Sequence, residues 1–451
     1  MNDASSAELS SARGAAERCM SVLALRGYAQ IETPLLEETE LFLRKSGGEL
    51  SSRLYDFVEP GGFRTSLRPE FTSPVIRYAI QTGEAANGVC RYSYYGPVFR
   101  YAKPEHNDGK KTRQFNQLGA ELIGVAAPRG DGEVIAMALE GLKSLDGRRV
   151  TVALGHVGLL RRLLRRFQLS ERANQFLLNN VQRLANGQAD SVRNDARQLG
   201  LLVSGDTTVM DGPDARQNIE AVLQRSMAPL GQNAGSRTRQ EIIARLARKQ
   251  THADDPLQFE SALSMLTELV TVSGDVETAI LDGRKLAASS GLDEECFTLI
   301  EQVVEAASDE GVDRDQLTIR FGLARGVAYY TGMVFDLLQS PGATETLGGG
   351  GRYDGLTRAL GLDTDVPALG FAYSFDAVLA TSPNLTRDTN ASLPVLVRPS
   401  DDSAWASAAR VAAEMRESGQ VAVVGTDTAD GTYAKVVVVR PDGTQVEGGS
   451  K

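Results

Sequence analysis

The chain has 451 residues, which at ~150 residues per domain is enough for two or three domains. Hydrophobic residues make up 42% and charged residues 24% of it, which is ordinary for a folded protein and excludes a largely disordered chain. The 58 Asp and Glu outnumber the 48 Lys and Arg, and the net charge of −10 disfavours extensive contact with nucleic acid. The 3 cysteines and 3 histidines show no metal-ligand spacing, so no disulfide framework, metal site or cofactor is expected.

The N-terminal part of the chain is expected to be helical. Apolar residues at helical spacing predict a helix over residues 8–26, with Ser10 or Ser11 as N-cap and Gly27 as its stop. A second helix is predicted from Leu35 to Arg44. The first residues are polar and no run of about 18 uncharged apolar residues occurs, so a cytoplasmic protein without a membrane span is expected.

The middle of the chain alternates between strand and helix patterns. Period-two alternation predicts antiparallel strands of one large sheet between residues 64 and 124. Residues 155 to about 312 have a helical pattern, and strand patterns resume at 316–338, 348–351 and 368–373. The predicted fold class is α+β, an antiparallel sheet flanked by helices with a helical insertion at about 156–312.

A linker and a short α/β tail are predicted at the C-terminal end. Residues 382–393 are rich in Ser, Thr, Asn and Pro, and a strand, a helix, a strand and a hairpin with a Pro-Asp-Gly turn follow. The predicted domains are therefore residues 1–385 and residues 386–451. Beyond residue 390 we count 6 Lys or Arg against 8 Asp or Glu, so no basic RNA-binding stripe is visible.

Polar and aromatic residues of several separate segments together suit an amino-acid pocket. A zwitterionic amino acid with an imidazole ring needs an acceptor for its ammonium, a cation for its carboxylate and an acceptor for a ring N–H between aromatic walls. Glu70, Arg325 and Glu121 supply these three groups. Taken singly, each of these three residues is more simply explained as a solvated charge at the end of a strand. The ordered set is LRPEFT (67–72), YYGPVFRYA (94–102), RQFNQLGAE (113–121), RGVAYYTG (325–332) and GGGGRYDGL (348–356).

Together with GYAQIETPLLEETELF, these segments resemble the catalytic domain of class II aminoacyl-tRNA synthetases, and of histidyl-tRNA synthetases in particular, over roughly residues 20–380. The resemblance implies a class II synthetase-like sheet and a homodimer formed partly around Pro34. It also implies a histidine pocket in which Glu70, Thr72 and Gln117 meet the ammonium and Arg325 meets the carboxylate. By the same resemblance Glu121, Tyr329 and Tyr330 surround the imidazole, and Arg100 faces the phosphate.

The chain departs from the synthetase pattern where nucleotide chemistry takes place. The acidic residue expected two positions after Arg100 is Ala102, and the third motif reads GFAYSFDAVL, with Ser374 for glycine and Ala377 for arginine. Ala328 stands where histidyl enzymes usually carry Asp. Because a methyl group cannot balance a phosphate charge, efficient aminoacylation is not expected and no catalytic residue is assigned.

A retained pocket, a lost arginine and a short tail resemble the regulatory subunits of ATP phosphoribosyltransferase. In that family a synthetase-like protein pairs with a short catalytic subunit, which makes phosphoribosyl-ATP in the first step of histidine biosynthesis, and histidine is the feedback inhibitor. The resemblance implies that catalytic subunit as partner and histidine as allosteric effector. A divergent histidyl-tRNA synthetase and a stand-alone amino-acid-binding module remain alternatives.

Two further features have structural explanations. His156 opens a predicted helix, so a capping or packing role is favoured over general-base catalysis. Gly348–Gly351 lacks the P-loop signature, so close strand packing under the ligand pocket is favoured over a phosphate cradle.

Overall fold

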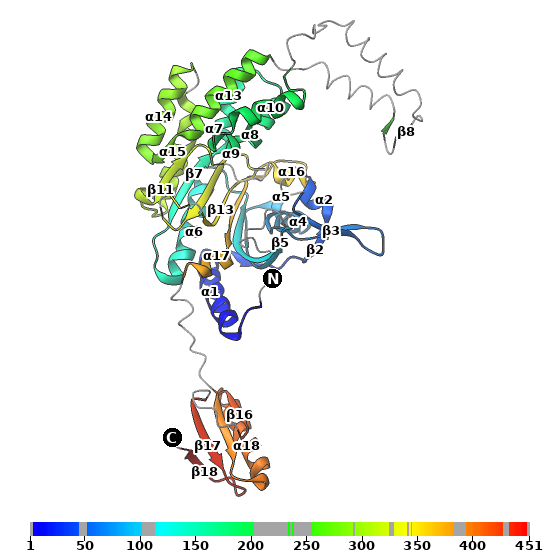
Figure 1. Cartoon of the computed structure of the whole chain (residues 1–451), viewed down its shortest axis with the longest axis vertical. Helices are drawn as coiled ribbons and strands as arrows, with labels where there is room; N and C mark the ends of the chain where they lie inside the picture. Colours follow the sequence, from blue (N-terminus) through cyan, green and yellow to red (C-terminus); the bar gives the residue numbers. More distant parts are fainter. Residues whose placement is uncertain are drawn as a thin grey trace. The chain divides into compact units, whose positions relative to one another are not determined.

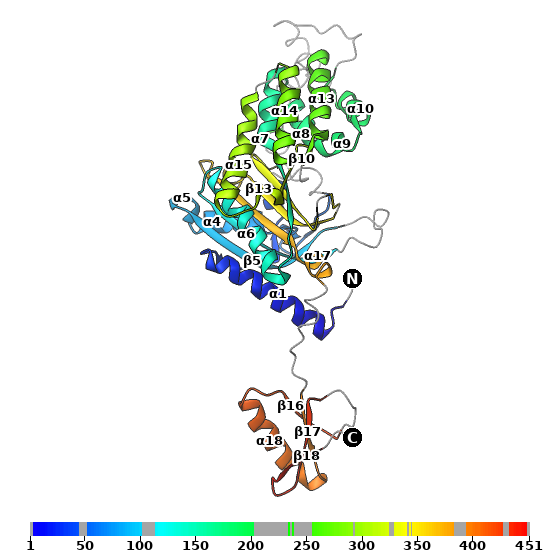
Figure 2. The ribbon, with the colours of Figure 1, turned by 90° about the vertical axis from the view of Figure 1, so that its left-hand side faces the viewer.

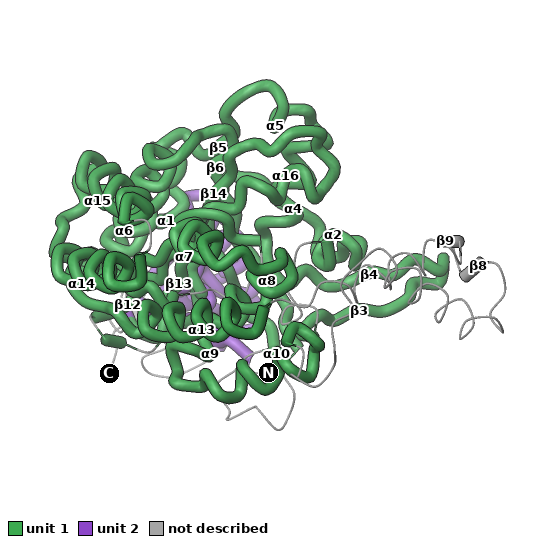
Figure 3. The backbone as a smooth tube through the Cα atoms, turned by 90° about the horizontal axis from the view of Figure 1, so that it is seen from above, with its two compact units in different colours: residues 1, 16–381 green, residues 2–15, 382–451 purple. Residues whose placement is uncertain are grey.

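The computed structural model describes most of the chain. It covers residues 3–44, 52–101, 113–202, 255–291, 294–323, 329–340, 342–343, 345–382, 394–426 and 433–448, with the backbone of 233–234 and 237–238. Contacts divide the chain into two units, residues 1 and 16–381 and residues 2–15 and 382–451 (Figure 3). Residues 383–393 of the predicted linker lie outside the described residues.

The larger unit is built on a nine-stranded sheet in the order β1-β5-β6-β14-β13-β12-β7-β11-β10 (Figure 1). Two neighbouring pairs, β1 with β5 and β11 with β7, are parallel, and the others are antiparallel. This arrangement confirms the predicted α+β class. The strands are β1 (Ala29–Gln30), β5 (Cys90–Phe99), β6 (Gln114–Ile123), β7 (Thr151–His156), β10 (Ser273–Asp275), β11 (Leu317–Arg320), β12 (Met333–Leu338), β13 (Thr346–Arg352) and β14 (Ala368–Ser374).

A separate three-stranded sheet corrects two predictions. It consists of β2 (Leu36–Glu38), β4 (Arg64–Leu67) and β3 (Tyr55–Val58), in that order. The helix predicted from Leu35 to Arg44 is therefore wrong in its first part, because Leu36 pairs with Leu67, and only α2 (Thr39–Leu43) is helical. The prediction that the segment from Arg64 joins the large sheet is also wrong. Two helices, α4 (Thr72–Gln81) and α5 (Glu84–Asn87), separate that segment from β5.

Helices cover the main sheet and gather at one end of it. Helix α6 lies against β13 and β14 and α15 against β7, and the two helices pack on each other (Figure 2). Among residues 156–202, 255–291 and 294–312, the predicted helical insertion is confirmed except for β10, which joins the edge of the main sheet beside β11. Most of residues 203–254, which the prediction also includes, lie outside the described residues. The α-helices described after β6 in the larger unit are α6 (Arg129–Asp146), α7 (Val157–Leu164), α8 (Glu171–Asn179), α9 (Val181–Ala185), α10 (Ala189–Gln198), α13 (Pro256–Thr271), α14 (Val276–Ser289), α15 (Thr298–Asp309), α16 (Leu356–Ala359) and α17 (Phe375–Ala380).

Side-chain caps fix where several helices begin. His156 Nδ1 accepts the Leu159 N–H at 3.0 Å, which confirms the predicted capping role. Burial lowers the pKa of His156 to about 4, so the ring is neutral near pH 7. The first helix, α1 (Ser6–Leu25), is instead capped by Ser5, whose Oγ accepts the Glu8 N–H at 3.3 Å, so the predicted caps at Ser10 or Ser11 are wrong.

Glycines allow the central strands to approach closely. A Cβ at Gly350 would lie 2.0 Å from the Gly370 carbonyl oxygen, and a Cβ at Gly370 would lie 1.8 Å from Glu121 Oε2. No side chain fits at either position, so β6, β14 and β13 can pair as they do only with glycine there. The close-packing explanation of the glycine run is confirmed.

A buried ion pair joins the end of β13 to the start of α6. Arg352 is 3% exposed, and its Nη2 lies 3.0 Å from Asp131 Oδ2 in the first turn of α6. Its Nη1 donates to the Val125 carbonyl and to Asp354 Oδ1, each at 3.1 Å. These bonds hold the segment that follows the glycine strand against the sheet.

The smaller unit contains a two-layer α/β structure. Its sheet has the order β16-β15-β17-β18, and α18 (Trp405–Glu417) packs on β15, β16 and β17. The Gly443 N–H bonds to the Arg440 carbonyl at 2.9 Å, which confirms the predicted turn. The strands are β15 (Val395–Pro399), β16 (Ala422–Val424), β17 (Lys435–Val439) and β18 (Gln445–Gly448).

Replacement of Arg352 by Gln should strongly destabilise the larger unit. Asp131 would be left buried without its cation, which costs about 3–5 kcal/mol. The matched control is Arg314→Gln, since Arg314 is half exposed and pairs with the exposed Glu277, a loss of at most about 1 kcal/mol. Denaturant unfolding of the full chain measures both changes. Equal losses of unfolding free energy in the two variants would contradict the structural role of the buried pair.

Candidate functional site

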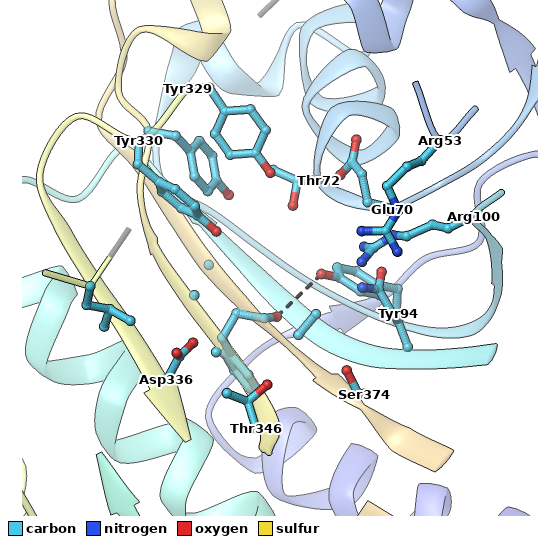
Figure 4. Close-up of a pocket in the computed structure, with 18 of the residues that line it drawn as sticks. Arg53, Glu70, Thr72, Tyr94, Arg100, Tyr329, Tyr330, Asp336, Thr346 and Ser374 are labelled. Atoms are coloured by element: carbon cyan, nitrogen blue, oxygen red, sulfur yellow. Dashed lines mark hydrogen bonds between the residues drawn. The ribbon is translucent and has the colours of Figure 1, made fainter. Parts of the chain in front are cut away.

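A cavity of about 320 Å³ lies over the centre of the main sheet, where the predicted pocket residues converge (Figure 4). Its walls come from the start of α4, from β5, β6, β12, β13 and β14, and from Gln182 of α9. The size is that of a small-molecule site. The predicted residues that line it are Glu70, Thr72, Arg100, Gln117, Tyr329 and Tyr330.

Glu121 lies directly behind this cavity and is not one of its lining residues. Its side chain, 1% exposed, accepts hydrogen bonds from Thr72 Oγ1 at 2.7 Å, from Tyr94 OH at 3.0 Å and from Tyr353 OH. Burial raises the pKa of Glu121 to about 8, although the three hydroxyl donors oppose that rise. Glu121 therefore reaches the cavity through these hydroxyl groups.

Glu70 and Gln117 form the polar end of the cavity. Both Glu70 carboxylate oxygens accept the Ser73 N–H, at 3.2 and 3.1 Å, so the start of α4 orients this carboxyl. Burial raises the pKa of Glu70. Gln117 is buried, and its Oε1 has no hydrogen-bond partner among the described residues. Both groups are acceptors suited to an ammonium group.

Two guanidinium groups, Arg53 and Arg100, line the cavity near Glu70 (Figure 4). Arg100 Nε donates to the Pro69 carbonyl at 2.9 Å, and its Cζ lies 5.1 Å from the centre of the Phe115 ring. Arg53 was not predicted as a site residue. The predicted carboxylate partner, Arg325, lies outside the described residues, as do Ala102 and Ala328.

Tyrosine rings form the apolar wall. Tyr329 lies 5.1 Å from Tyr330 and 5.6 Å from Tyr353, measured between ring centres. All three rings line the cavity and are nearly buried. A planar heterocycle would find edge and face contacts here. Tyr353 and Tyr94 also line the cavity, although their motifs did not predict a role for either side chain.

The end of the cavity opposite Arg53 and Arg100 is lined by Asp336 and Thr346 and by no described Lys or Arg (Figure 4). Ser374 also lines the cavity, where it is the cross-strand partner of Gln117. Thr346 borders a second cavity of about 300 Å³, which Ala377 lines. The described residues that border this second cavity include Glu345 and no Lys or Arg. The place where the synthetase pattern requires an arginine is therefore neutral to acidic.

Among the described residues, no three or more His, Cys, Asp or Glu form a group that could hold a metal ion. No helix in this part of the chain is long and apolar enough to span a membrane.

Solved structures share this fold. An ATP phosphoribosyltransferase regulatory subunit/histidyl-tRNA synthetase from Bacillus halodurans superimposes with a TM-score of 0.67, covering 98% of this chain and 97% of that chain at 20% identity. A histidyl-tRNA synthetase from S. aureus gives 0.59 over 98% of this chain and 90% of that chain, also at 20% identity. At such identities the likeness establishes the fold alone, which is that of a class II aminoacyl-tRNA synthetase.

Sequence comparison gives the family. The family model described as histidyl-tRNA synthetase matches residues 1–230 and 223–378. An ATP phosphoribosyltransferase regulatory subunit from Allorhizobium ampelinum is 33% identical over 374 residues, 79% of this chain and 94% of that protein. A histidine–tRNA ligase from Methanocaldococcus jannaschii is 29% identical over 395 residues, 88% of this chain and 77% of that protein. The chain belongs to the histidyl-tRNA synthetase family.

The buried carboxyl of Glu121 should make the stability of the protein depend on pH. Its pKa of about 8 in the folded state exceeds the ordinary value of 4.5, so the folded chain binds this proton more tightly than the unfolded chain. Its contribution to stability therefore falls as the pH rises from about 4.5 to about 8. Glu121→Gln removes this titration and should flatten that part of the profile.

Thermal unfolding of the full chain across this pH range provides the measurement. The control is Glu268→Gln, which changes an exposed carboxyl on α13 and should leave the wild-type profile unaltered. A Glu121→Gln profile parallel to that of the wild type would show that Glu121 does not titrate in this range.

Proposed function

We propose that this protein is a noncatalytic regulatory subunit of ATP phosphoribosyltransferase that binds histidine in the cavity over the main sheet. One observation carries the proposal: the cavity brings together acceptors, tyrosine rings and guanidinium groups suited to histidine, whereas position 377, which lines a separate cavity, is alanine. The 33% identity to a protein named as such a regulatory subunit, over 94% of its length, supports the same assignment.

The described side chains suit histidine group by group. Glu70 and Gln117 provide acceptors for the ammonium, and the Thr72 hydroxyl adds a third, since its proton is donated to Glu121. The tyrosine wall accepts the imidazole, with the Glu121-bound hydroxyls of Tyr94 and Tyr353 at its base. The carboxylate then faces the guanidinium groups, including the one predicted at Arg325.

Adenylate chemistry lacks support at the opposite end. Activation of a carboxylate by ATP builds up negative charge that cations must stabilise, and the loss of one such donor costs about 10²–10³ in rate. Asp336 and Glu345 add repulsion instead. Histidine bound here would act as an effector, because a ligand that prefers one conformation of a complex shifts the complex toward it.

In this proposal the partner is the short-form catalytic subunit, and the synthetase-like core forms a homodimer within the complex. Nucleic acid has no assigned role. A divergent histidine–tRNA ligase is the second candidate, favoured by the retained Arg100 and by relatives named as ligases. Histidine-dependent ATP–pyrophosphate exchange by the purified chain would establish that alternative.

Mixing the full chain with a short-form catalytic subunit tests the proposal. The rate of phosphoribosyl-ATP formation should rise on mixing, and added histidine should lower it. An unchanged rate on mixing would refute the regulatory function, whatever ligand the cavity binds.

Replacement of Glu70 by Gln should separate stimulation of the catalytic subunit from its inhibition by histidine. The variant loses a charge-assisted hydrogen bond to the ligand ammonium, worth about 1.5–3 kcal/mol, so histidine should bind at least about tenfold more weakly. Stimulation of the catalytic subunit should persist while inhibition shifts to higher histidine concentration. Glu268→Gln is again the control, and equal inhibition curves for the two variants would remove Glu70 from the binding site.

A further inference from the structure

Arg53 is a cavity residue that none of the synthetase-like motifs includes. It precedes the β3–β4 hairpin, whereas Arg100 follows β5, yet both line the same cavity. They are the only Lys or Arg among the described residues that line it. Figure 4 shows both side chains directed toward the same end of the cavity, near Glu70.

The fold fixes the Arg100 guanidinium and the backbone at Arg53. The Tyr101 N–H donates to the Arg53 carbonyl at 2.7 Å, which ties the hairpin to the residue after Arg100. The Tyr55 and Tyr101 rings meet edge to face at 5.7 Å across the same junction. Arg100 is held by the Pro69 carbonyl and the Phe115 ring. The Arg100 cation is therefore placed before any ligand arrives, and Arg53 is anchored beside it through its backbone.

This arrangement matches the head group of a free amino acid. An ammonium and a carboxylate on one carbon need an anionic and a cationic partner close together, and Glu70 with the two arginines provides them. We propose that Arg53, together with Arg100, forms a carboxylate-binding subsite that makes the cavity selective for an amino acid with a free carboxylate. This inference rests on the proposed function, since it takes histidine as the ligand.

The charge balance of the cavity favours a carboxylate over a polyphosphate. Two arginines face two carboxyl side chains, Glu70 and Asp336, among the described lining residues. A zwitterion leaves this balance unchanged, whereas a triphosphate would add several negative charges with no further cation to meet them. Guanidinium groups bind carboxylates through paired N–H donors, so lysine at position 53 would replace only the charge.

Calorimetry with L-histidine and L-histidinol tests the subsite, because histidinol keeps the imidazole and the ammonium and carries a neutral hydroxymethyl group in place of the carboxylate. The wild-type chain should prefer histidine by at least about tenfold. Arg53→Gln should weaken the binding of histidine by about tenfold and change the affinity for histidinol by less than about threefold. Arg53→Lys should recover part of the preference for histidine over histidinol. Arg64→Gln is the matched control, because Arg64 belongs to the same hairpin, is largely exposed and does not line the cavity.

The outcomes separate this inference from the proposed function. Absence of histidine binding to the wild-type chain would overturn the proposed function and the inference with it. Histidine binding with an unchanged histidine-to-histidinol ratio in Arg53→Gln would overturn the inference alone. An equal loss of both ligands in Arg53→Gln, with a lowered unfolding temperature, would also overturn it, because Arg53 would then support the fold and not the carboxylate.

Discussion

The site depends on one buried carboxyl group. Glu121 on β6 accepts hydrogen bonds from hydroxyl groups at the start of α4, on β5 and in the segment after β13. A single side chain therefore connects four parts of the larger unit. A buried carboxyl is unfavourable unless polar partners surround it. Because its three partners also line the cavity, the bonds that make Glu121 tolerable in the core fix the floor of the pocket.

Local patterns were sufficient to predict the long strands and were misleading for a short one. The patterns in residues 90–99 and 114–123 match two ten-residue strands. The second half of β5 alternates between buried and half-buried residues, whereas the last seven residues of β6 are all buried. Leu36–Glu38 contains only helix-favouring residues, yet it pairs with β4. Over three residues tertiary pairing outweighs propensity, and nothing in the local sequence reveals the partner strand.

The candidate site shows the same division between local and tertiary information. Thr72 and Gln117 lie in motifs with a recognisable order, so their resemblance to a histidine pocket could be stated from the sequence, although their role stays a prediction. Arg53 belongs to no such motif, and its backbone bond to Tyr101 ties it to the residue that follows Arg100 beside the cavity. The position of Glu121 behind its hydroxyl donors likewise requires the close approach of β14, which Gly370 permits. The spacing of residues along the chain predicts neither the position of Arg53 at the cavity nor that of Glu121 behind its hydroxyl donors.

The cavity over the main sheet and the second cavity, which Ala377 lines, are built from different supports. The first depends on Glu121, on the ion pair of Arg352 and on glycine contacts between strands, all within the core. Ala377 lies on α17, after β14 has ended, and makes no part of these networks. Position 377 can therefore hold alanine in place of arginine without exposing a buried group or opening a gap under the tyrosines. In the proposed function, this is how the chain can lack a cation that phosphate chemistry needs while the supports of its amino-acid pocket stay in place.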